Sequence, residues 1–239
     1  MNWFNIIINL AASIITRRNT ADNSQAGAVS EPLQGKKSDK LETQSLPLTA
    51  KPDFDESRIE QDYSVTQKWH TGWKRPLEQI TEVVIHHTDG TGNIETLKRW
   101  MLGGERKAQY VKGISLFHFA IDRNGKIWKA GPLSRWWYHS CSGKYDRFTV
   151  GIEIIHKSGA FTDAQYENLF WMLFEYMPNF CTSYQRIVSH DYNYNTYSKI
   201  KKGCPGPDFD WKRLEAEMVK RGIVFETRGF EEYSLKFPV

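Results

Sequence analysis

Apolar residues recur along this chain with two different periods, and the two alternate from about residue 55 onward. Short runs rich in valine, isoleucine and phenylalanine predict buried strands, whereas apolar residues three or four positions apart predict helices. We expect strands within residues 83–85, 114–130, 149–155 and 186–190, and helices within residues 93–102, 162–177 and 208–222. Strands interleaved with helices are typical of an α/β domain, in which helices flank a central mixed β-sheet.

Residues at the ends of these segments support the assignment. Asn93 is expected to cap the first helix, and Thr162 or Asp163 the second, because short polar side chains accept hydrogen bonds from the first turn. Gly222 is placed to end the last helix. Within 114–130, the Arg-Asn-Gly triplet has the chemistry of a hairpin turn, so this segment is expected to form two strands.

The first 16 residues differ from the rest of the chain. Residues 3–16 form an uncharged apolar run, which is shorter than the roughly 18–20 residues that span a bilayer but long enough for the core of a signal peptide. We therefore expect residues 1–16 to be a signal or membrane-attachment segment, and the protein to be exported or associated with the cell envelope, periplasmic or membrane-attached. Arg17 and Arg18 follow the run instead of preceding it. A helix docked on the domain of a cytoplasmic protein is thus the alternative.

The next segment, residues 17–54, is polar and nearly free of aromatic residues. Such a composition buries too little apolar surface to offset the entropy of ordering, so we expect a flexible linker. Aromatic residues become frequent from Phe54 onward, and residues 55–239 are expected to be a single domain with a C-terminal tail.

Charge and cysteine content exclude some classes of protein. The chain has 32 basic and 28 acidic residues, a net charge of +4, and this small excess is not gathered into a basic block. We therefore expect no nucleic-acid partner. Three cysteines without a C-x-x-C pair are too few for a disulfide scaffold, although a single Cys141–Cys181 disulfide would be compatible with export. The protein is expected to be a monomer.

Potential metal ligands occur where the predicted strands end. His86 or His87 follows Val-Val-Ile, and His190 follows the strand at 186–190. Cys204 lies in a Gly-Cys-Pro-Gly sequence, which is typical of a loop and not of a core. Two imidazoles and a thiolate suit zinc and leave its fourth position open, as in catalytic sites. Because these residues are far apart in the sequence, structural histidines and a buried cysteine are the alternative at this point.

Five segments, taken together, resemble a known family: VVIHHT, FHFAIDRNGKIW, TVGIEI, FTDAQYENL and SHDY…KKGCPGPDFDW. Their order and spacing are similar to those of the zinc-dependent N-acetylmuramoyl-L-alanine amidases of the type-2 class. That superfamily includes amidase-type phage lysozymes, muropeptide-recycling amidases and animal peptidoglycan recognition proteins. The resemblance covers roughly residues 80–215. It implies a mixed sheet flanked by helices with a zinc cleft at one edge, Zn2+ as cofactor, and peptidoglycan or a muropeptide as substrate.

The resemblance also implies a role for individual residues. His86, His190 and Cys204 correspond to the zinc ligands, and Glu153 to the catalytic glutamate of the recycling amidases. Lys202 corresponds to the lysine that stabilises the oxyanion. From the residues alone, Glu153 could also be a solvated strand residue, and Lys202 part of a solvated lysine cluster.

Other positions depart from the family or leave two interpretations open. Phe117 stands where two branches have a catalytic tyrosine, so Glu153 is expected to carry the proton transfer. His139 resembles a histidine that lines the substrate cleft, and we expect it and Trp137 to contact substrate. Trp136, Trp137 and Tyr138 could equally be core residues. His87 is expected to pack beside the site, whereas His118 and His156 are strand histidines without an assigned use.

The function that the resemblance implies is hydrolysis of the amide bond between N-acetylmuramic acid and L-alanine. The alternative is a peptidoglycan recognition module that binds without hydrolysis. The presence of all three ligand residues favours the enzyme.

Overall fold

The computed structural model describes residues 56–69, 72–90, 92–103, 116–140, 143–193, 203–223 and 226–228. The predicted signal or attachment segment, the predicted linker and Lys202 lie outside these residues, so these predictions stay predictions. The described residues all belong to one compact unit. Among them, no helix is both long and apolar enough to cross a membrane.

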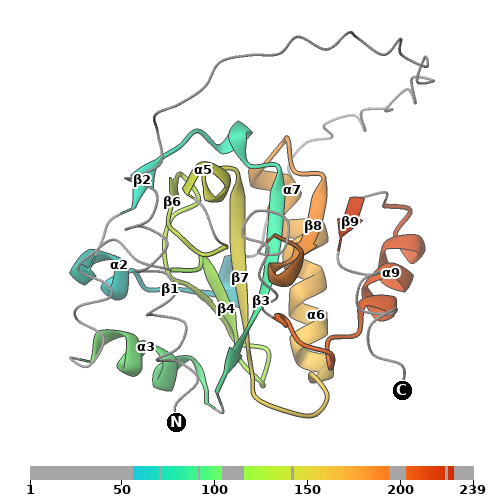
Figure 1. Cartoon of the computed structure of the whole chain (residues 1–239), viewed down its shortest axis with the longest axis horizontal. Helices are drawn as coiled ribbons and strands as arrows, with labels where there is room; N and C mark the ends of the chain where they lie inside the picture. The colour runs from blue at the N-terminus through green and yellow to red at the C-terminus, as the bar shows by residue number, and fades with distance from the viewer. Residues whose placement is uncertain are drawn as a thin grey trace, which may run out of the picture. The chain divides into compact units, whose positions relative to one another are not determined.

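A seven-stranded sheet forms the centre of the domain (Figure 1). The strand order is β1-β5-β4-β7-β3-β8-β9, and every neighbouring pair is parallel except β4 with β5. This mixed sheet with helices around it confirms the predicted α/β class. The strands are β1 (Ile59–Gln61), β3 (Glu82–Asp89), β4 (Phe119–Ile121), β5 (Ile127–Lys129), β7 (Thr149–His156), β8 (Arg186–Ser189) and β9 (Glu226–Arg228).

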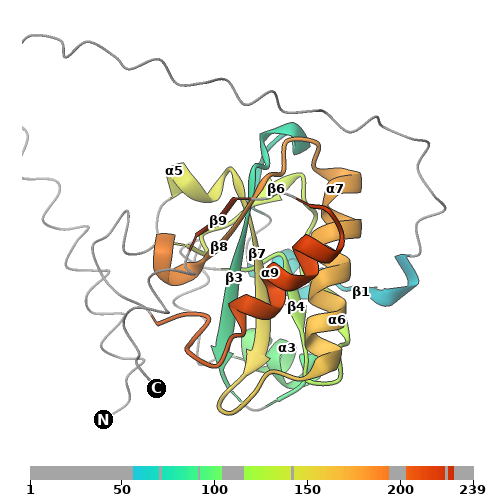
Figure 2. The same cartoon turned by 90° about the vertical axis from the view of Figure 1, so that its right-hand side faces the viewer.

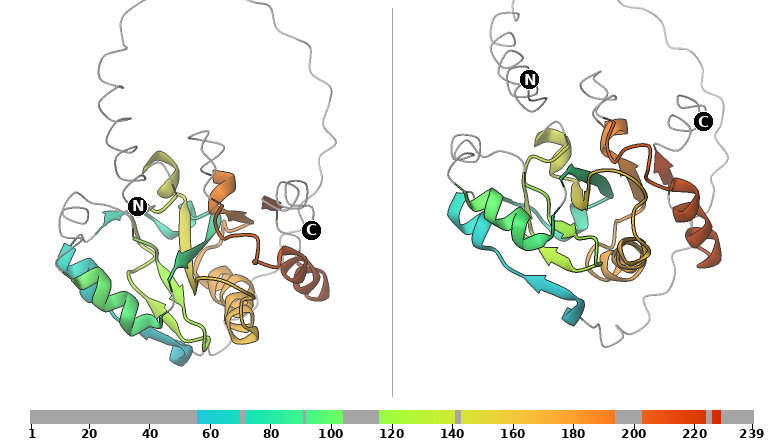
Figure 3. Two further views of the ribbon diagram at one scale, coloured as in Figure 1. Left: turned by 60° about the horizontal axis from the view of Figure 1, so that its bottom comes forward. Right: turned by 90° about the horizontal axis from the view of Figure 1, so that it is seen from below.

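Helices pack on both faces of this sheet (Figures 2 and 3). On one face, a larger core contains residues of α6, its continuation through the π-helical turn η4 into α7, and α9. On the other, a smaller core contains residues of α2 and α3. The described part also contains a two-stranded sheet of β2 and β6, the short helical segments α5, η1 and η2, and a helical turn at residues 190–193. The bounds are α2 (Ser64–Trp69), α3 (Ile94–Leu102), α5 (Gly143–Asp146), α6 (Asp163–Trp171), η4 (Met172–Tyr176), α7 (Met177–Phe180), α9 (Trp211–Lys220), β2 (Trp73–Lys74), β6 (Arg135–Trp136), η1 (Glu56–Arg58) and η2 (Leu77–Gln79).

The predicted helix ends and the predicted hairpin are confirmed. The Asn93 side chain accepts from Thr96 N at the start of α3, and Thr162, not Asp163, caps α6. Gly222 follows α9 with a φ of 64°. The antiparallel pair β4 and β5 turns through Gly125, whose φ of 84° is a conformation that glycine adopts without steric cost.

Strand β3 is longer than the sequence predicted. It does not end after Ile85 but continues through His86 to Asp89, because all eight of its residues pair with β7. In this register His86 lies opposite Glu153 and Ile85 opposite Ile152. Neighbours in register share a face of the sheet, so the two isoleucines face the larger core. His86 and Glu153 therefore face the opposite side, where Ile155 joins the smaller core.

The described cysteines are not in disulfides. Cys181 and Cys204 are both free and buried, and Cys181 is part of the larger core. Cys141, the other member of the disulfide considered from the sequence, lies outside the described residues, and Cys181 is not in a disulfide. Burial explains the thiol at 181, because a reduced cysteine packs as a small apolar residue.

Candidate metal centre

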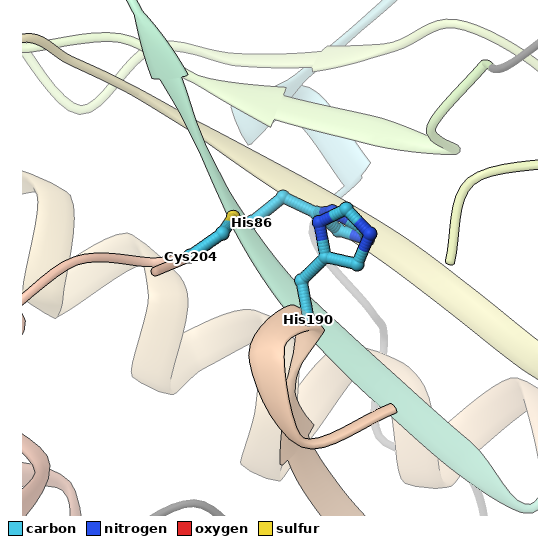
Figure 4. Close-up of side chains that lie close together, drawn as sticks. All are labelled: His86, His190 and Cys204. Atoms are coloured by element: carbon cyan, nitrogen blue, oxygen red, sulfur yellow. The ribbon is translucent and has the colours of Figure 1, made fainter. Parts of the chain in front are cut away.

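Three potential metal ligands converge on the α2/α3 side of the sheet, although they are far apart in the sequence. His86, His190 and Cys204 each offer a ligand atom, and these atoms all lie within 4.8 Å of one another (Figure 4). His86 and Cys204 are buried, and His190 is partly exposed. In the described part of the chain this is the one group of three or more His, Cys, Asp or Glu residues arranged to hold a metal ion.

Parallel strand pairing brings the two histidines together. Strand β8 lies directly beside β3, with Ile85 opposite Ser189. The residue that follows Ile85 is His86, and the residue that follows Ser189 is His190. Their ring centroids are 4.3 Å apart. His190 begins a helical turn where β8 ends, so its ring projects from the end of a buried strand. Strand ends hold side chains rigidly and leave them open to ligands.

Residues 203–210 form the loop that carries Cys204, here called the cysteine loop. Hydrogen bonds hold this loop against the same two strands. Asp191 N donates to Cys204 O at 2.9 Å, and Gly203 N donates to the Asp191 carboxylate at 3.0 Å. His87 N donates to Cys204 Sγ at 3.3 Å. Gly203, with a φ of 63°, allows the tight turn that these contacts require. The segments that carry His190 and Cys204 are thus bonded to each other.

The donor set fits zinc. In a tetrahedral zinc site with Zn–N near 2.1 Å and Zn–S near 2.3 Å, ligand atoms lie about 3.5 Å apart, so three atoms within 4.8 Å need only small side-chain adjustments. Imidazole and thiolate suit zinc better than they suit calcium or magnesium. Three protein ligands also leave one position open, as in catalytic sites.

Glu153 lies next to this group on β7. It is paired in register with His86, it is half-buried, and burial is the one influence that shifts the pKa of its side chain. Burial disfavours its charged form and raises the pKa of this carboxyl to about 8. A carboxyl poised near neutral pH can both accept and return a proton. The location and the pKa suit the predicted role in proton transfer.

His139 lies beneath the metal centre. The residue is 7% exposed, its Nδ1 is 3.1 Å from His86 Nε2, and its Nε2 is 2.9 Å from Thr149 Oγ1. Burial, with the nearby charges of Arg75 and His190, lowers the pKa of His139 to about 3, so the ring is neutral. Its two ring nitrogens contact the metal ligand His86 and Thr149 of β7, and its contact with substrate stays a prediction.

Trp137 is a core residue in this structure. It is 1% exposed and belongs to the smaller core. The backbone lies close against its ring: a Cβ added at Gly131 would lie 2.2 Å from it, and one at Gly72 would lie 2.6 Å from it. The structure thus places Trp137 in the smaller core, as the alternative interpretation had it, and its contact with substrate stays a prediction.

Phe117 is also buried, at 8% exposure, and its ring meets that of Trp128 edge to face. The position at which two branches of the family have a tyrosine therefore carries a core phenylalanine here.

A buried polar cluster beside His139 was not predicted from the sequence. Arg75 donates to the carbonyls of Leu133 at 2.8 Å and Thr149 at 2.6 Å, and it contacts His118 at 2.8 Å. Without a water shell, the pKa of Arg75 falls to about 9. Burial raises the pKa of Asp146, which is 0% exposed, to about 6. Only Thr149 had a signal in the sequence, since it alternates in phase with Glu153.

The remaining histidines have structural contacts. His118 is fully buried, and its Nδ1 accepts from Gly151 N at 3.2 Å. His156 stacks on Phe161 with the ring centroids 3.9 Å apart, and its Nε2 lies 3.4 Å from Asp208 in the cysteine loop. The backbone N–H of His87 contacts the Cys204 sulfur, as expected for a residue that packs beside the site.

One comparison with known proteins shows the family of this chain. The family model for N-acetylmuramoyl-L-alanine amidase matches residues 76–207, which is more than half of the chain. No curated protein matches the sequence.

Solved structures with a similar course of the chain include amidases and a recognition protein. The amidase LysC from Clostridium intestinale is 17% identical, with a TM-score of 0.49 over 69% of this chain and 97% of its own. The Ph2119 endolysin from a Thermus scotoductus bacteriophage is 16% identical, with a TM-score of 0.48 over 66% of this chain and 97% of its own. Human PGRP-Iβ C, solved with a glycosamyl muramyl pentapeptide, is 19% identical, with a TM-score of 0.45 over 62% of this chain and 89% of its own. From the family match, the chain belongs to the N-acetylmuramoyl-L-alanine amidase family of the type-2 class, in the superfamily that also contains the peptidoglycan recognition proteins.

Proposed function

We propose that this protein is a zinc-dependent hydrolase that cleaves the amide bond between N-acetylmuramic acid and L-alanine in peptidoglycan or muropeptides. The observation that carries the proposal is the convergence of His86, His190 and Cys204 to within 4.8 Å. A protein that only binds muropeptides has no need of this donor set. Glu153 lies opposite His86 in the same sheet, which adds a proton carrier to the ligands.

In this proposal the two imidazoles and the thiolate hold Zn2+. Zinc in such a site acts as a Lewis acid on the amide carbonyl and activates water for attack. Glu153 takes the proton of the attacking water and gives it to the leaving amine of L-alanine. Its raised pKa favours the second half of this exchange, because a carboxyl that holds a proton near neutral pH can also deliver it. From the family resemblance, Lys202 stabilises the oxyanion.

The proposed mechanism is tested by changing Glu153→Gln, which keeps the size of the side chain and removes the proton carrier. We expect hydrolysis of a muramoyl-L-alanyl peptide to fall at least about 100-fold, the scale of general acid–base catalysis, while the zinc content stays at one ion per chain. Glu167→Gln, at an exposed position of α6, is the matched control and keeps full activity. Wild-type hydrolysis by the Glu153→Gln protein contradicts the assigned role.

Recognition without hydrolysis is the second candidate, and one observation favours it. Phe117 is buried where two branches of the superfamily have a tyrosine, so this chain lacks that hydroxyl near the site. Zinc-loaded wild-type protein should separate the two candidates. Release of free L-alanyl peptides from purified cell walls supports the amidase, whereas saturable binding of muropeptide without release supports the recognition module.

We also propose that the protein acts outside the cytoplasm, exported or attached to the envelope through residues 1–16. Mass spectrometry of the N-terminus of the protein isolated from its native cells tests this. Cleavage after the apolar run, or recovery with the membrane fraction, is expected. An intact N-terminus in the soluble cytoplasmic fraction contradicts it and favours intracellular muropeptide turnover.

A further inference from the structure

A chain of hydrogen bonds runs from His86 away from the metal centre into the buried polar cluster. His86 Nε2 lies 3.1 Å from His139 Nδ1, and His139 Nε2 lies 2.9 Å from Thr149 Oγ1. Thr149 Oγ1 in turn lies 3.2 Å from the carbonyl oxygen of Asp146. His139, Thr149 and Asp146, the other members of this series of hydrogen bonds, are all buried, so water does not replace any of the contacts.

One assignment of protons gives each of these contacts a donor and an acceptor. The Asp146 carbonyl can only accept, so the Thr149 hydroxyl donates to it. The Thr149 oxygen then accepts from His139 Nε2–H. A neutral imidazole has one N–H and one lone pair, so His139 Nδ1 is left to accept from His86 Nε2–H. His86 consequently carries its own lone pair on Nδ1.

We propose that His139 is a positioning residue, which holds His86 in the Nε2-protonated tautomer and thereby fixes Nδ1 as its metal-binding atom. Histidine ligands commonly donate their second ring nitrogen to such a partner, which sets both the tautomer and the orientation of the ring. Here the partner is a second imidazole instead of a carboxylate or a carbonyl. The inference rests on the metal centre of the proposed function and not on the identity of the substrate.

The residue after His139 supports the other histidine ligand. His190 Nε2 donates to the Ser140 carbonyl at 2.9 Å, which leaves Nδ1 as its metal-binding atom as well. Ser140 is held in turn by Asp146, whose Oδ1 accepts from both its backbone N–H, at 2.9 Å, and its hydroxyl. Two consecutive residues therefore orient the two imidazoles: the His139 side chain orients His86, and the Ser140 carbonyl orients His190.

The backbone of β7 is shaped to admit the His139 ring. A Cβ at position 151 would lie 2.9 Å from His139 Nδ1 and 3.0 Å from its Cγ, closer than real Cβ contacts. Glycine at 151 thus allows the ring to lie between β7 and His86. The His139 ring meets the rings of His86 and His118 edge to face, at 5.3 Å and 5.7 Å. These contacts leave the ring little freedom to turn.

Two substitutions at 139 separate positioning from packing. In His139→Asn the amide oxygen can occupy the place of Nδ1 and accept from His86, whereas in His139→Gln the amide lies near the place of Nε2 and leaves His86 without that acceptor. We expect His139→Gln to weaken zinc affinity about 10- to 100-fold, measured by competition with a chromophoric chelator, and His139→Asn to recover most of the loss. If both proteins bind zinc as tightly as the wild type, or if Asn binds no better than Gln, the proposal is overturned.

Thr149, at the far end of this series of hydrogen bonds, and Thr66 offer a matched pair of substitutions. Thr149→Val removes the hydroxyl that receives His139 Nε2–H, and a several-fold loss of zinc affinity is expected. Thr66→Val removes another buried threonine hydroxyl, bonded to Tyr63 O at 2.9 Å, and should leave zinc affinity unchanged. Equal zinc affinities in the two proteins contradict a role for the hydrogen-bond chain.

The tautomer itself can be observed without any substitution. In the metal-free wild-type protein, long-range 1H–15N NMR spectra are expected to show His86 protonated at Nε2. Protonation at Nδ1 overturns the proposal even if the variants at 139 do not fold. None of these measurements uses hydrolysis, so a protein that binds zinc in this way but cleaves no muropeptide would refute the proposed function and leave this inference intact.

Discussion

The two faces of the central sheet are made by alternate residues of the same strands, yet they have different chemistry. On β7, Ile152 and Ile154 face a larger core of aliphatic and aromatic side chains that includes α6 and α9. Glu153, between them, faces the metal ligands on the other side. One face stabilises the fold by burying apolar surface. The other holds buried ionisable groups, whose shifted pKa values are a cost to stability that the fold must offset.

The buried groups of the site depend on the stability of the core behind them. Arg75 and Asp146 are both buried, and burial shifts the pKa of each in the direction that favours its neutral form. Such groups persist only where the surrounding structure is stable enough to hold them. Substitutions on the two faces should therefore have different consequences for zinc binding and for stability.

The two buried free thiols lie on opposite sides of this division. Cys204→Ser should abolish zinc binding in the micromolar range and with it hydrolysis, because a hydroxyl is a much weaker zinc ligand than a thiolate. Cys181→Ser should keep zinc binding but lower the free energy of unfolding by about 1–3 kcal/mol, because it buries a hydroxyl in an apolar core. Zinc content and urea unfolding test both; full zinc content in Cys204→Ser rules out this ligand.

A cavity in the larger core should affect stability and leave the site chemistry alone. Ile152→Ala removes a side chain that is 0% exposed, and a loss of about 2–5 kcal/mol in the free energy of unfolding is expected. Zinc affinity of the folded protein, measured well below the unfolding transition, should be unchanged. A large drop in affinity would mean that the two faces are coupled through β7.

Asp146 should make the stability of the metal-free protein depend on pH. Its pKa is about 6 in the folded protein against 3.8 when exposed, so the folded state binds the extra proton between these values. The contribution of Asp146 to stability therefore falls as the pH rises from about 4 to above 6, by on the order of 3 kcal/mol. Asp146→Asn should remove this fall, and Asp163→Asn, at an exposed carboxyl, should retain it. Denaturant unfolding at several pH values measures the difference, and parallel curves for wild type and Asp146→Asn contradict it.

An exposed ion pair on the surface of the larger core provides the smallest effect. Arg213 and Asp163 are 2.7 Å apart, with side chains 39% and 92% exposed, so water screens the pair. Arg213→Ala should lower the free energy of unfolding by no more than about 1 kcal/mol at low salt, and by less in 1 M NaCl. Thermal unfolding of the wild type and the variant at low salt and in 1 M NaCl measures both losses. A larger loss would indicate that the cation–π contact of Arg213 with Tyr166 also stabilises the fold.

Several features of the fold and of the site could be predicted from the sequence because they depend on neighbours along the chain. The caps at Asn93 and Thr162 act on residues three positions away, and the alternation around Glu153 gives its face of the sheet. The ligands came from the family resemblance. The end of β3 was misplaced because its length is set by pairing with β7, and that partner lies 67 residues further along the sequence at each position.

Side-chain periodicity along the chain was enough to predict the α/β class and the hydrophobic and polar faces of the strands, whereas the three metal ligands were assigned from the family resemblance. The folded structure was needed to show that Trp137 is a core residue, that His139 bonds to His86, and that Arg75 and Asp146 lie buried beside them. Burial and hydrogen-bond partners are properties of a packed chain. They arise when loops distant in sequence meet over the sheet, and no local pattern encodes that meeting.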